Sequence, residues 1–171
     1  MKERSGKRVL GTIFAVPVLL ALGIVLSPLL ILAGLGYCIG TVWLASRLLG
    51  TWPAGTSVLL GYTQSPLWAP FIEQHLVPRL GDVVVAVDRS NEAWKRKYPI
   101  EARALKFWGG IRSYNPIAIV IRKPWRIRIF RFYEAFRQFK HGKPHELEAQ
   151  VSELLAYIQS GSGAGANSTP D

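Results

Sequence analysis

The chain has 171 residues, 49% of them hydrophobic, and a formal net charge of +10. This length allows one ordinary domain and an additional segment. The single cysteine, Cys38, excludes a disulfide within the chain. Because Cys38 lies in the apolar segment at the start of the chain, thiol chemistry in the rest of the protein is excluded as well.

The first segment is an apolar run from Val9 to Ser46, which holds 38 residues without a charged side chain. A bilayer core needs about 20 helical residues, whereas a secretory signal has an apolar stretch of only about 7–15. Two interpretations remain for a run of this length. Either two short transmembrane helices turn near Ser27-Pro28, or one tilted helix spans and the remainder lies at the interface or in the soluble domain. The length favours the hairpin.

Basic residues flank the apolar run on both sides. Four precede it, within residues 1–8: Lys2, Arg4, Lys7 and Arg8. After the run, 17 Lys and Arg residues stand against 10 Asp and Glu residues. Lys and Arg favour the cytoplasmic side, and only an even number of spans keeps both flanks there. We therefore expect an integral membrane protein with a cytoplasmic soluble domain, since a single span would place that domain across the membrane from the N-terminus.

Two glycines inside the run, Gly36 and Gly40, form a small-xxx-small pattern that lets two helices approach closely. The pattern is compatible with packing inside the chain and with a homo-oligomer.

After a linker at residues 47–55, the chain is predicted to form an α/β domain over residues 56–160 and to end in a disordered tail at 161–171. The expected elements are a strand at 57–62, a helix at 65–79, a strand at 82–88, a helix at 91–108 interrupted at Pro99, a strand at 115–121, a strand beginning at Trp125 and a helix from Pro144. The first two strands are expected to be parallel, because a helix connects them, and the last two antiparallel, because their turn is tight.

The order β-α-β-α-β-β-α resembles the thioredoxin fold. The stretch "FWGGIRSYNPIAIVI" is similar to the region after the second helix of thioredoxin-like domains, where a proline precedes an apolar third strand. The resemblance implies that Pro116, preceded by Asn115, is cis and lies against the turn that carries CxxC in redox members. "KHGKPHELEAQVSELLAYI" is similar to the glycine and final helix of such domains. The expected architecture is thus a transmembrane helical hairpin followed by a thioredoxin-like domain.

The position that matches CxxC reads "SPLW", with Ser65 near the first thiol position and Trp68 near the second. Disulfide exchange needs a thiolate nucleophile, which this turn lacks. The resemblance therefore implies a redox-inactive member of the superfamily.

The same turn carries three hydroxyl groups, on Tyr62, Thr63 and Ser65. Some glutathione-binding relatives use a Ser or Tyr hydroxyl here, and a helix N-terminus favours an anionic ligand or thiolate. In the structural interpretation, Ser65 caps the helix, Pro66 starts it and Trp68 packs. The structural interpretation is favoured, because a serine needs a base to become a nucleophile and the sequence identifies none.

Other candidate sites have simpler explanations. Asp88 ends the second strand, but the first turn lacks the glycine fingerprint of dinucleotide-binding folds, so a capping role is expected. His141 and His145 are separated by Gly142 and Pro144, which prevents a regular helix from aligning their rings, and the third histidine, His75, is distant in the sequence. We predict neither a metal nor a cofactor.

The most basic stretch, Arg122 to Lys143, has eight Lys or Arg residues and six aromatic residues against one acid, Glu134. It is either an edge hairpin whose arginines keep the edge soluble, a face for anionic lipid headgroups, or a nucleic-acid surface. The membrane anchor supplies proximity to lipid, so headgroups are favoured over nucleic acid. The candidate binding residues of this stretch and of the turn are Trp68, Pro116, Arg122, Lys123, Trp125, Arg126, Arg128 and Arg131.

Together these patterns predict a non-enzymatic membrane protein. Its redox-inactive thioredoxin-like domain is held at the cytoplasmic face, where it docks a protein partner or membrane lipids. The alternative is a membrane-bound, glutathione-related enzyme in which Tyr62, Thr63 or Ser65 stabilises a bound thiolate.

Overall fold

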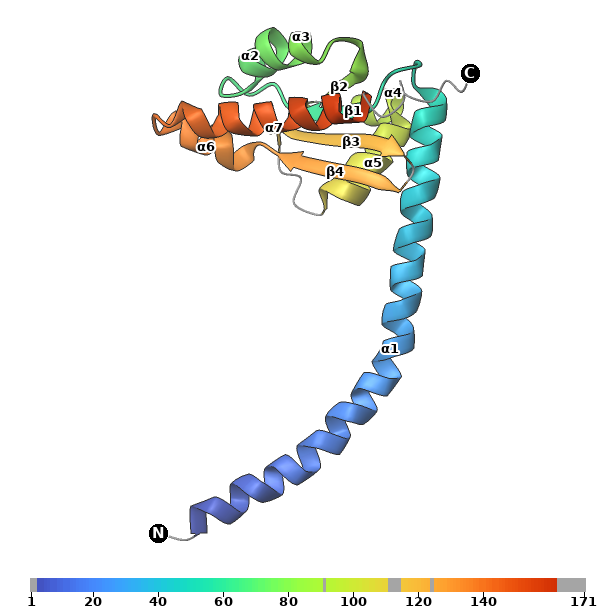
Figure 1. Cartoon of the computed structure of the whole chain (residues 1–171), viewed down its shortest axis with the longest axis vertical. Coiled ribbons are helices and arrows are strands. Elements are labelled where there is room, and N and C mark those ends of the chain that lie inside the picture. The colour runs from blue at the N-terminus through green and yellow to red at the C-terminus, as the bar shows by residue number, and fades with distance from the viewer. Residues whose placement is uncertain (1–2, 91, 111–114, 124, 163–171) are drawn as a thin grey trace, which may run out of the picture. The chain divides into compact units, whose positions relative to one another are not determined.

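The computed structural model describes residues 3–90, 92–110, 115–123 and 125–162, with side chains described between residues 23 and 160 (Figure 1). The protein is a mixed α/β structure with one long apolar N-terminal helix and a four-stranded mixed sheet. Two compact units divide between Thr41 and Val42. Most of the tail predicted at 161–171 lies outside the described residues.

Helix α1 (Glu3–Thr51) continues through Ser27-Pro28, where the sequence predicted a turn. Pro28 has no N–H and cannot donate to the carbonyl of Ile24. The hydroxyl of Ser27 donates to that carbonyl instead, at 3.0 Å, so the proline is accommodated within one helix. The structure thus replaces the predicted hairpin by a single helix, of which Gly23–Thr51 is long and apolar enough to cross a membrane.

The last turns of α1 belong to the second unit. Leu44 and Leu48 are buried, as is Trp52 just beyond the helix, whereas Trp43 exposes 52% of its surface. Apolar residues four apart lie on one face of a helix, and here that face covers the domain core. Residues 47–55, predicted as a linker, are therefore helix and core as far as Trp52.

The sheet consists of β1 (Val58–Tyr62), β2 (Val84–Asp88), β3 (Ile117–Lys123) and β4 (Arg126–Arg131), in the order β2-β1-β3-β4. Strand β1 is parallel to β2 and antiparallel to β3, and β3 is antiparallel to β4. All five residues of β1 are buried, as expected for a central strand covered on both faces. The β1–β2 and β3–β4 directions agree with those predicted from the sequence, which made no prediction for the β1–β3 pair.

The helical elements are α2 (Ala69–Phe71), the π-helix η1 (Ile72–Leu76), α3 (Val77–Leu80), the 3₁₀ turn η2 (Gly81–Val83), α4 (Trp94–Lys97), α5 (Pro99–Gly109), α6 (Tyr133–Lys140) and α7 (Pro144–Ser162). The first three form one helical stretch, and its π turn comes just before Pro78, which has no N–H to donate. Helix α6 lies inside the basic stretch and was not predicted. It forms because Phe132 and Phe136, four residues apart, both reach the core.

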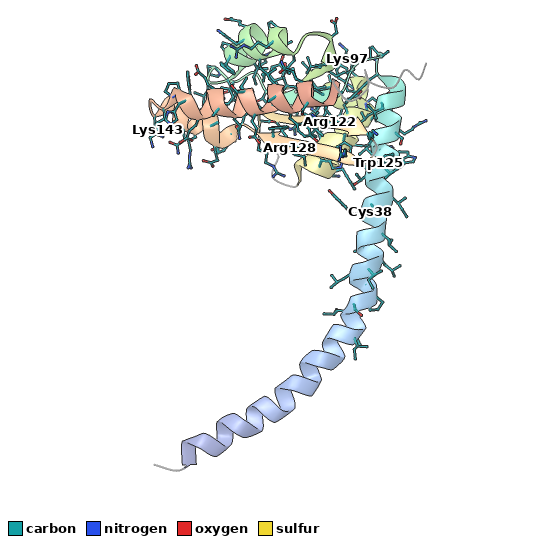
Figure 2. All side chains as sticks on the ribbon, in the orientation of Figure 1. Cys38, Lys97, Arg122, Trp125, Arg128 and Lys143 are labelled. Atoms are coloured by element: carbon teal, nitrogen blue, oxygen red, sulfur yellow. The ribbon has the colours of Figure 1, made fainter. Side chains whose placement is uncertain are left out.

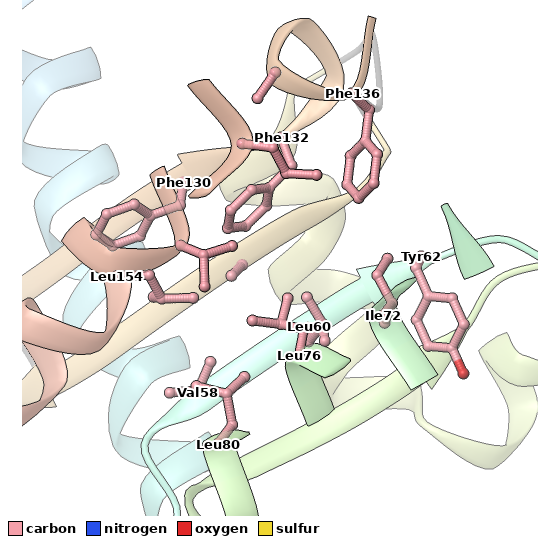
Figure 3. Close-up of a cluster of buried hydrophobic side chains, with 14 of the residues drawn as sticks. Val58, Leu60, Tyr62, Ile72, Leu76, Leu80, Phe130, Phe132, Phe136 and Leu154 are labelled. Atoms are coloured by element: carbon pink, nitrogen blue, oxygen red, sulfur yellow. The ribbon is translucent and has the colours of Figure 1, made fainter. Parts of the chain in front are cut away.

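Hydrophobic clusters cover both faces of the sheet. The first cluster joins alternate residues of β1 and β3 to the helical stretch from α2 to α3, to α6 and to α7 (Figure 3). The second joins the intervening strand residues to α4, α5 and the last turns of α1. This division follows from the two-residue period of a strand, which sends successive side chains to opposite faces.

Candidate functional site

The turn from Ser65 to Trp68, which follows β1, is closed by its own hydrogen bonds. The indole N–H of Trp68 donates to the carbonyl of Thr63 at 3.0 Å, and the N–H of Leu67 donates to Oγ of Ser65 at 3.4 Å. The N–H of Ala69 donates to the carbonyl of Ser65 at 2.9 Å. Ser65 therefore caps a turn and not the helix itself, because the helix begins at Ala69 and not at Pro66, three residues later than predicted.

The hydroxyl of Tyr62 is engaged by a carboxylate. It donates to Oε1 of Glu73 at 3.0 Å, and the side-chain amide of Gln64 donates to the same oxygen at 2.8 Å. Burial raises the pKa of Tyr62 to about 12, and the hydrogen bond to Glu73 and the charges of Glu73 and Asp88 act in the same direction. The hydroxyl proton of Tyr62 is therefore already donated to Glu73. The negative charge of Glu73 would also repel a bound thiolate.

Asp88, at the end of β2, closes a small turn with Ser90. It accepts hydrogen bonds from the backbone N–H of Ser90 at 2.9 Å and from its hydroxyl at 2.6 Å. Oγ of Ser90 in turn accepts from the N–H of Gln64 at 2.5 Å, which ties the ends of β1 and β2 together. Partial burial raises the pKa of Asp88, but the hydrogen bonds of Ser90 and Gln64 lower it and prevail. These contacts give Asp88 a structural role.

The Asn115–Pro116 peptide bond is cis, as the resemblance implied, and Pro116 is buried. The register pairs Gly61 with Ile117, so Pro116 stands opposite the end of β1, where the turn begins. Arg89 donates from its guanidinium to Oδ1 of Asn115 at 2.8 Å.

Arg89 was missed by the sequence analysis. Its backbone N–H donates to the carbonyl of Tyr62 at 2.7 Å, and its guanidinium lies 5.3 Å from the ring centroid of Trp94. Burial lowers the pKa of Arg89. The only sequence signal for this residue is its position directly after an apolar strand.

Two of the predicted binding arginines, Arg122 and Arg128, are held by contacts with α7. The guanidinium of Arg122 lies 3.8 Å from the ring centroid of Tyr157 and donates to Oγ of Ser160 at 2.7 Å. The guanidinium of Arg128 lies 4.9 Å from the same centroid and forms an ion pair with Glu153. Both side chains therefore attach α7 to the edge of the sheet.

The remaining basic residues of β3 and β4 are exposed. Lys123, Trp125 and Arg126 lie at the end of the β3–β4 hairpin, and Trp125 exposes 68% of its surface. Arg131, at the other end of β4, is exposed, and its carbonyl accepts a hydrogen bond from Gln150 at 3.2 Å. The structure thus divides the predicted binding residues into a held pair and an exposed set.

Neither the turn nor the basic edge assembles a metal site. Among the described residues no three His, Cys, Asp or Glu side chains are grouped as metal ligands would be. Cys38 is exposed on α1. Comparisons with protein-family models, with curated proteins and with solved structures returned no match to this chain.

Proposed function

We propose that this protein is a membrane-anchored, redox-inactive thioredoxin-like domain that acts as an interaction module. The sheet order β2-β1-β3-β4 and the strand directions support the thioredoxin-like assignment. So do the helices on both faces and the cis Pro116 opposite the end of β1. The membrane assignment is supported by the length and apolar composition of Gly23–Thr51.

The observation that carries the redox-inactive assignment is the turn from Ser65 to Trp68. The two positions that would carry thiols hold a serine that accepts a backbone hydrogen bond and an indole that closes the turn on Thr63. Without a thiol the turn has no nucleophile for disulfide exchange. What remains for such a domain is to hold a partner through its surface.

A single span would also change the proposed side of the membrane on which the domain lies. The cytoplasmic placement depended on an even number of spans, which one helix does not supply. Lys and Arg close to a span determine orientation most strongly, and large domains translocate largely regardless of charge. Four basic residues precede the apolar run, whereas Arg47 is followed by none until Arg79. We therefore place the N-terminus in the cytoplasm and the domain on the opposite side.

A gain of thiol chemistry tests the fold and the missing nucleophile together. In a full-length Cys38→Ser background, Ser65→Cys combined with Trp68→Cys restores the spacing of a redox turn. We expect the two thiols to form a disulfide on mild oxidation and the reduced variant to accelerate reduction of a disulfide substrate. The matched control, Ser65→Cys alone, forms no internal disulfide. A correctly folded double variant whose thiols do not pair would contradict the fold, and disulfide reduction by the unmodified chain would contradict the redox-inactive assignment.

Glutathione binding tests the enzyme alternative. The full-length chain and its Ser65→Ala variant are passed over immobilised glutathione in detergent. We expect neither to be retained, because the hydroxyl of Tyr62 is engaged by Glu73. Retention of the wild type that is lost on Ser65→Ala would favour the glutathione-related enzyme.

A further inference from the structure

The end of the β3–β4 hairpin presents three exposed side chains, Lys123, Trp125 and Arg126, which we call the tip. Trp125 is labelled in Figure 2. Trp125 is the most exposed large aromatic residue among those whose side chains are described. The side chains of Lys123 and Arg126 form no hydrogen bond or ion pair with any residue whose side chain is described. The tip thus carries two cationic groups and an indole that the domain itself does not use.

The neighbouring arginines show that these properties are specific to the tip. Arg122 and Arg128 are stacked on Tyr157 and bonded to α7. Arg128 is paired with an acid and Arg122 is bonded to a hydroxyl, so both guanidinium groups are held in place. The cations at the tip have no such partners within the described part of the domain, and they lie next to the exposed indole of Trp125.

The tip lies at the part of the domain that α1 joins. Ile121 and Ile127, which flank the tip in the sequence, belong to the same hydrophobic cluster as Leu44 of α1. Trp43, the residue before Leu44, is half exposed and ends the series of exposed apolar residues of α1. The last exposed apolar residue, Trp43, is thus followed directly by the first buried residue, Leu44, without an intervening linker.

We propose that the tip docks on anionic phospholipid headgroups in the leaflet that faces the domain, on the bilayer that α1 crosses. Tryptophan is enriched at the membrane–water interface, where its ring lies at the level of the headgroups, and Lys and Arg are attracted to anionic lipid. The tip combines both residue types, and its flanking isoleucines share a hydrophobic cluster with the last turns of α1 in the same unit. This inference rests on the proposed function, because it takes α1 as a membrane span.

Tryptophan fluorescence of the full-length chain in vesicles tests the inference. The vesicles are phosphatidylcholine with or without phosphatidylglycerol, and their lipids are brominated close to the headgroup. The chain has six tryptophans, so the emission of Trp125 is obtained as the difference between wild type and Trp125→Phe. In phosphatidylglycerol vesicles we expect this difference emission to be blue-shifted and quenched by the brominated lipid, and less so without phosphatidylglycerol.

Charge variants test the two cations, each measured with and without Trp125→Phe. Lys123→Gln with Arg126→Gln should lower the docking equilibrium about thirtyfold, with a matching loss of quenching. The matched control is Lys140→Gln with Lys143→Gln, which removes the same charge from the end of α6 and the loop that follows it. Lys143 lies at the other end of the domain from Trp125 (Figure 2). This control should keep the quenching of wild type.

Two results would overturn the inference and a third would overturn the proposed function instead. If the chain floats with the vesicles but Trp125 stays unquenched, the tip does not contact lipid. Its partner would then be a protein or a nucleic acid. If the brominated lipid quenches Trp125 equally in the tip variant and in the control variant, the cations of the tip do not select anionic lipid. A chain that does not float with the vesicles at all would show that α1 is not a span.

Discussion

At the scale of single residues, the least expected group is the carboxylate of Glu101 on α5. It is only 8% exposed, and the indole N–H of Trp52 donates to its Oε1 at 2.9 Å. A buried charged group without a hydrogen-bond partner is costly. The contact therefore joins the residue that follows α1 to the helix that packs beside it.

Trp52→Phe should destabilise the domain, because it leaves the buried oxygen of Glu101 without its indole donor. We expect a loss of about 1–3 kcal/mol in the free energy of unfolding. The loss is measured by circular dichroism during denaturant unfolding of the full-length chain in detergent. The control is Glu101→Gln, whose amide oxygen can still accept the indole hydrogen bond and which should cost less. Equal stability of wild type and Trp52→Phe would show that the hydrogen bond is unimportant.

Tyr62 should make stability depend on alkaline pH. Its pKa rises from 10.0 to about 12 in the folded state, so the folded chain keeps a proton that the unfolded chain loses between these values. Stability from Tyr62 is fully present below pH 10.0 and is lost as the pH rises toward 12. Unfolding measured across this range should show a smaller advantage of wild type over Tyr62→Phe at higher pH. A constant difference between the two proteins would contradict the raised pKa.

Sequence reasoning identified the types of residue at the turn but not their partners. Ser65 and Trp68 were recognised from Ser-Pro and from the spacing of a redox turn. Glu73, Arg89 and Glu101 were missed as partners, because each bonds a residue between 11 and 49 positions away. Such contacts depend on how the strands and helices pack, which local patterns do not contain.

At the scale of elements, close packing between β1 and α5 depends on Gly61. A Cβ at this position would lie 2.9 Å from Cδ2 of Leu105 and 3.3 Å from Cδ of Arg89. Leu105 is buried, so it has little room to move away. The glycine thus sets the distance between the central strand and its covering helix.

Gly61→Ala should destabilise the domain by about 1–3 kcal/mol, because the added methyl group overpacks a filled core. The control is Gly109→Ala, whose Cβ would lie 3.6 Å from Cδ1 of Ile117, an ordinary contact distance. Thermal unfolding of the two full-length variants in the same detergent measures the difference. A Gly109→Ala variant as unstable as Gly61→Ala would show that the effect does not come from the contact with Leu105.

The strands were easier to predict than the helices. Continuous apolar runs predicted β1 and β3, and the directions of the β1–β2 and β3–β4 pairs followed from their connections. Two helical features were misjudged. Pro28 favoured a turn until the hydroxyl of Ser27 supplied the missing donor, and α6 was hidden because arginines and aromatics continue from β4 into it.

At the scale of the whole molecule, one helix in place of a hairpin changes the expected topology. A reporter fused to the carboxyl end that is active only outside the cytoplasm should be active, whereas one fused to the amino end should not. Replacing Lys2, Arg4, Lys7 and Arg8 with Gln should increase the share of inverted chains, because Lys and Arg close to a span favour the cytoplasmic side. A carboxyl-terminal reporter that is active only in the cytoplasm would contradict the single span or its orientation.

Because Leu44, Leu48 and Trp52 complete the second hydrophobic cluster, the anchor helix also serves as a lid on the sheet. A protease that cuts just before β1 would release a fragment in which the isoleucine-rich face of the sheet is exposed to solvent and prone to aggregate. Such a fragment should therefore aggregate or be degraded. Under the proposed function, the domain is stable only while it stays joined to its membrane anchor.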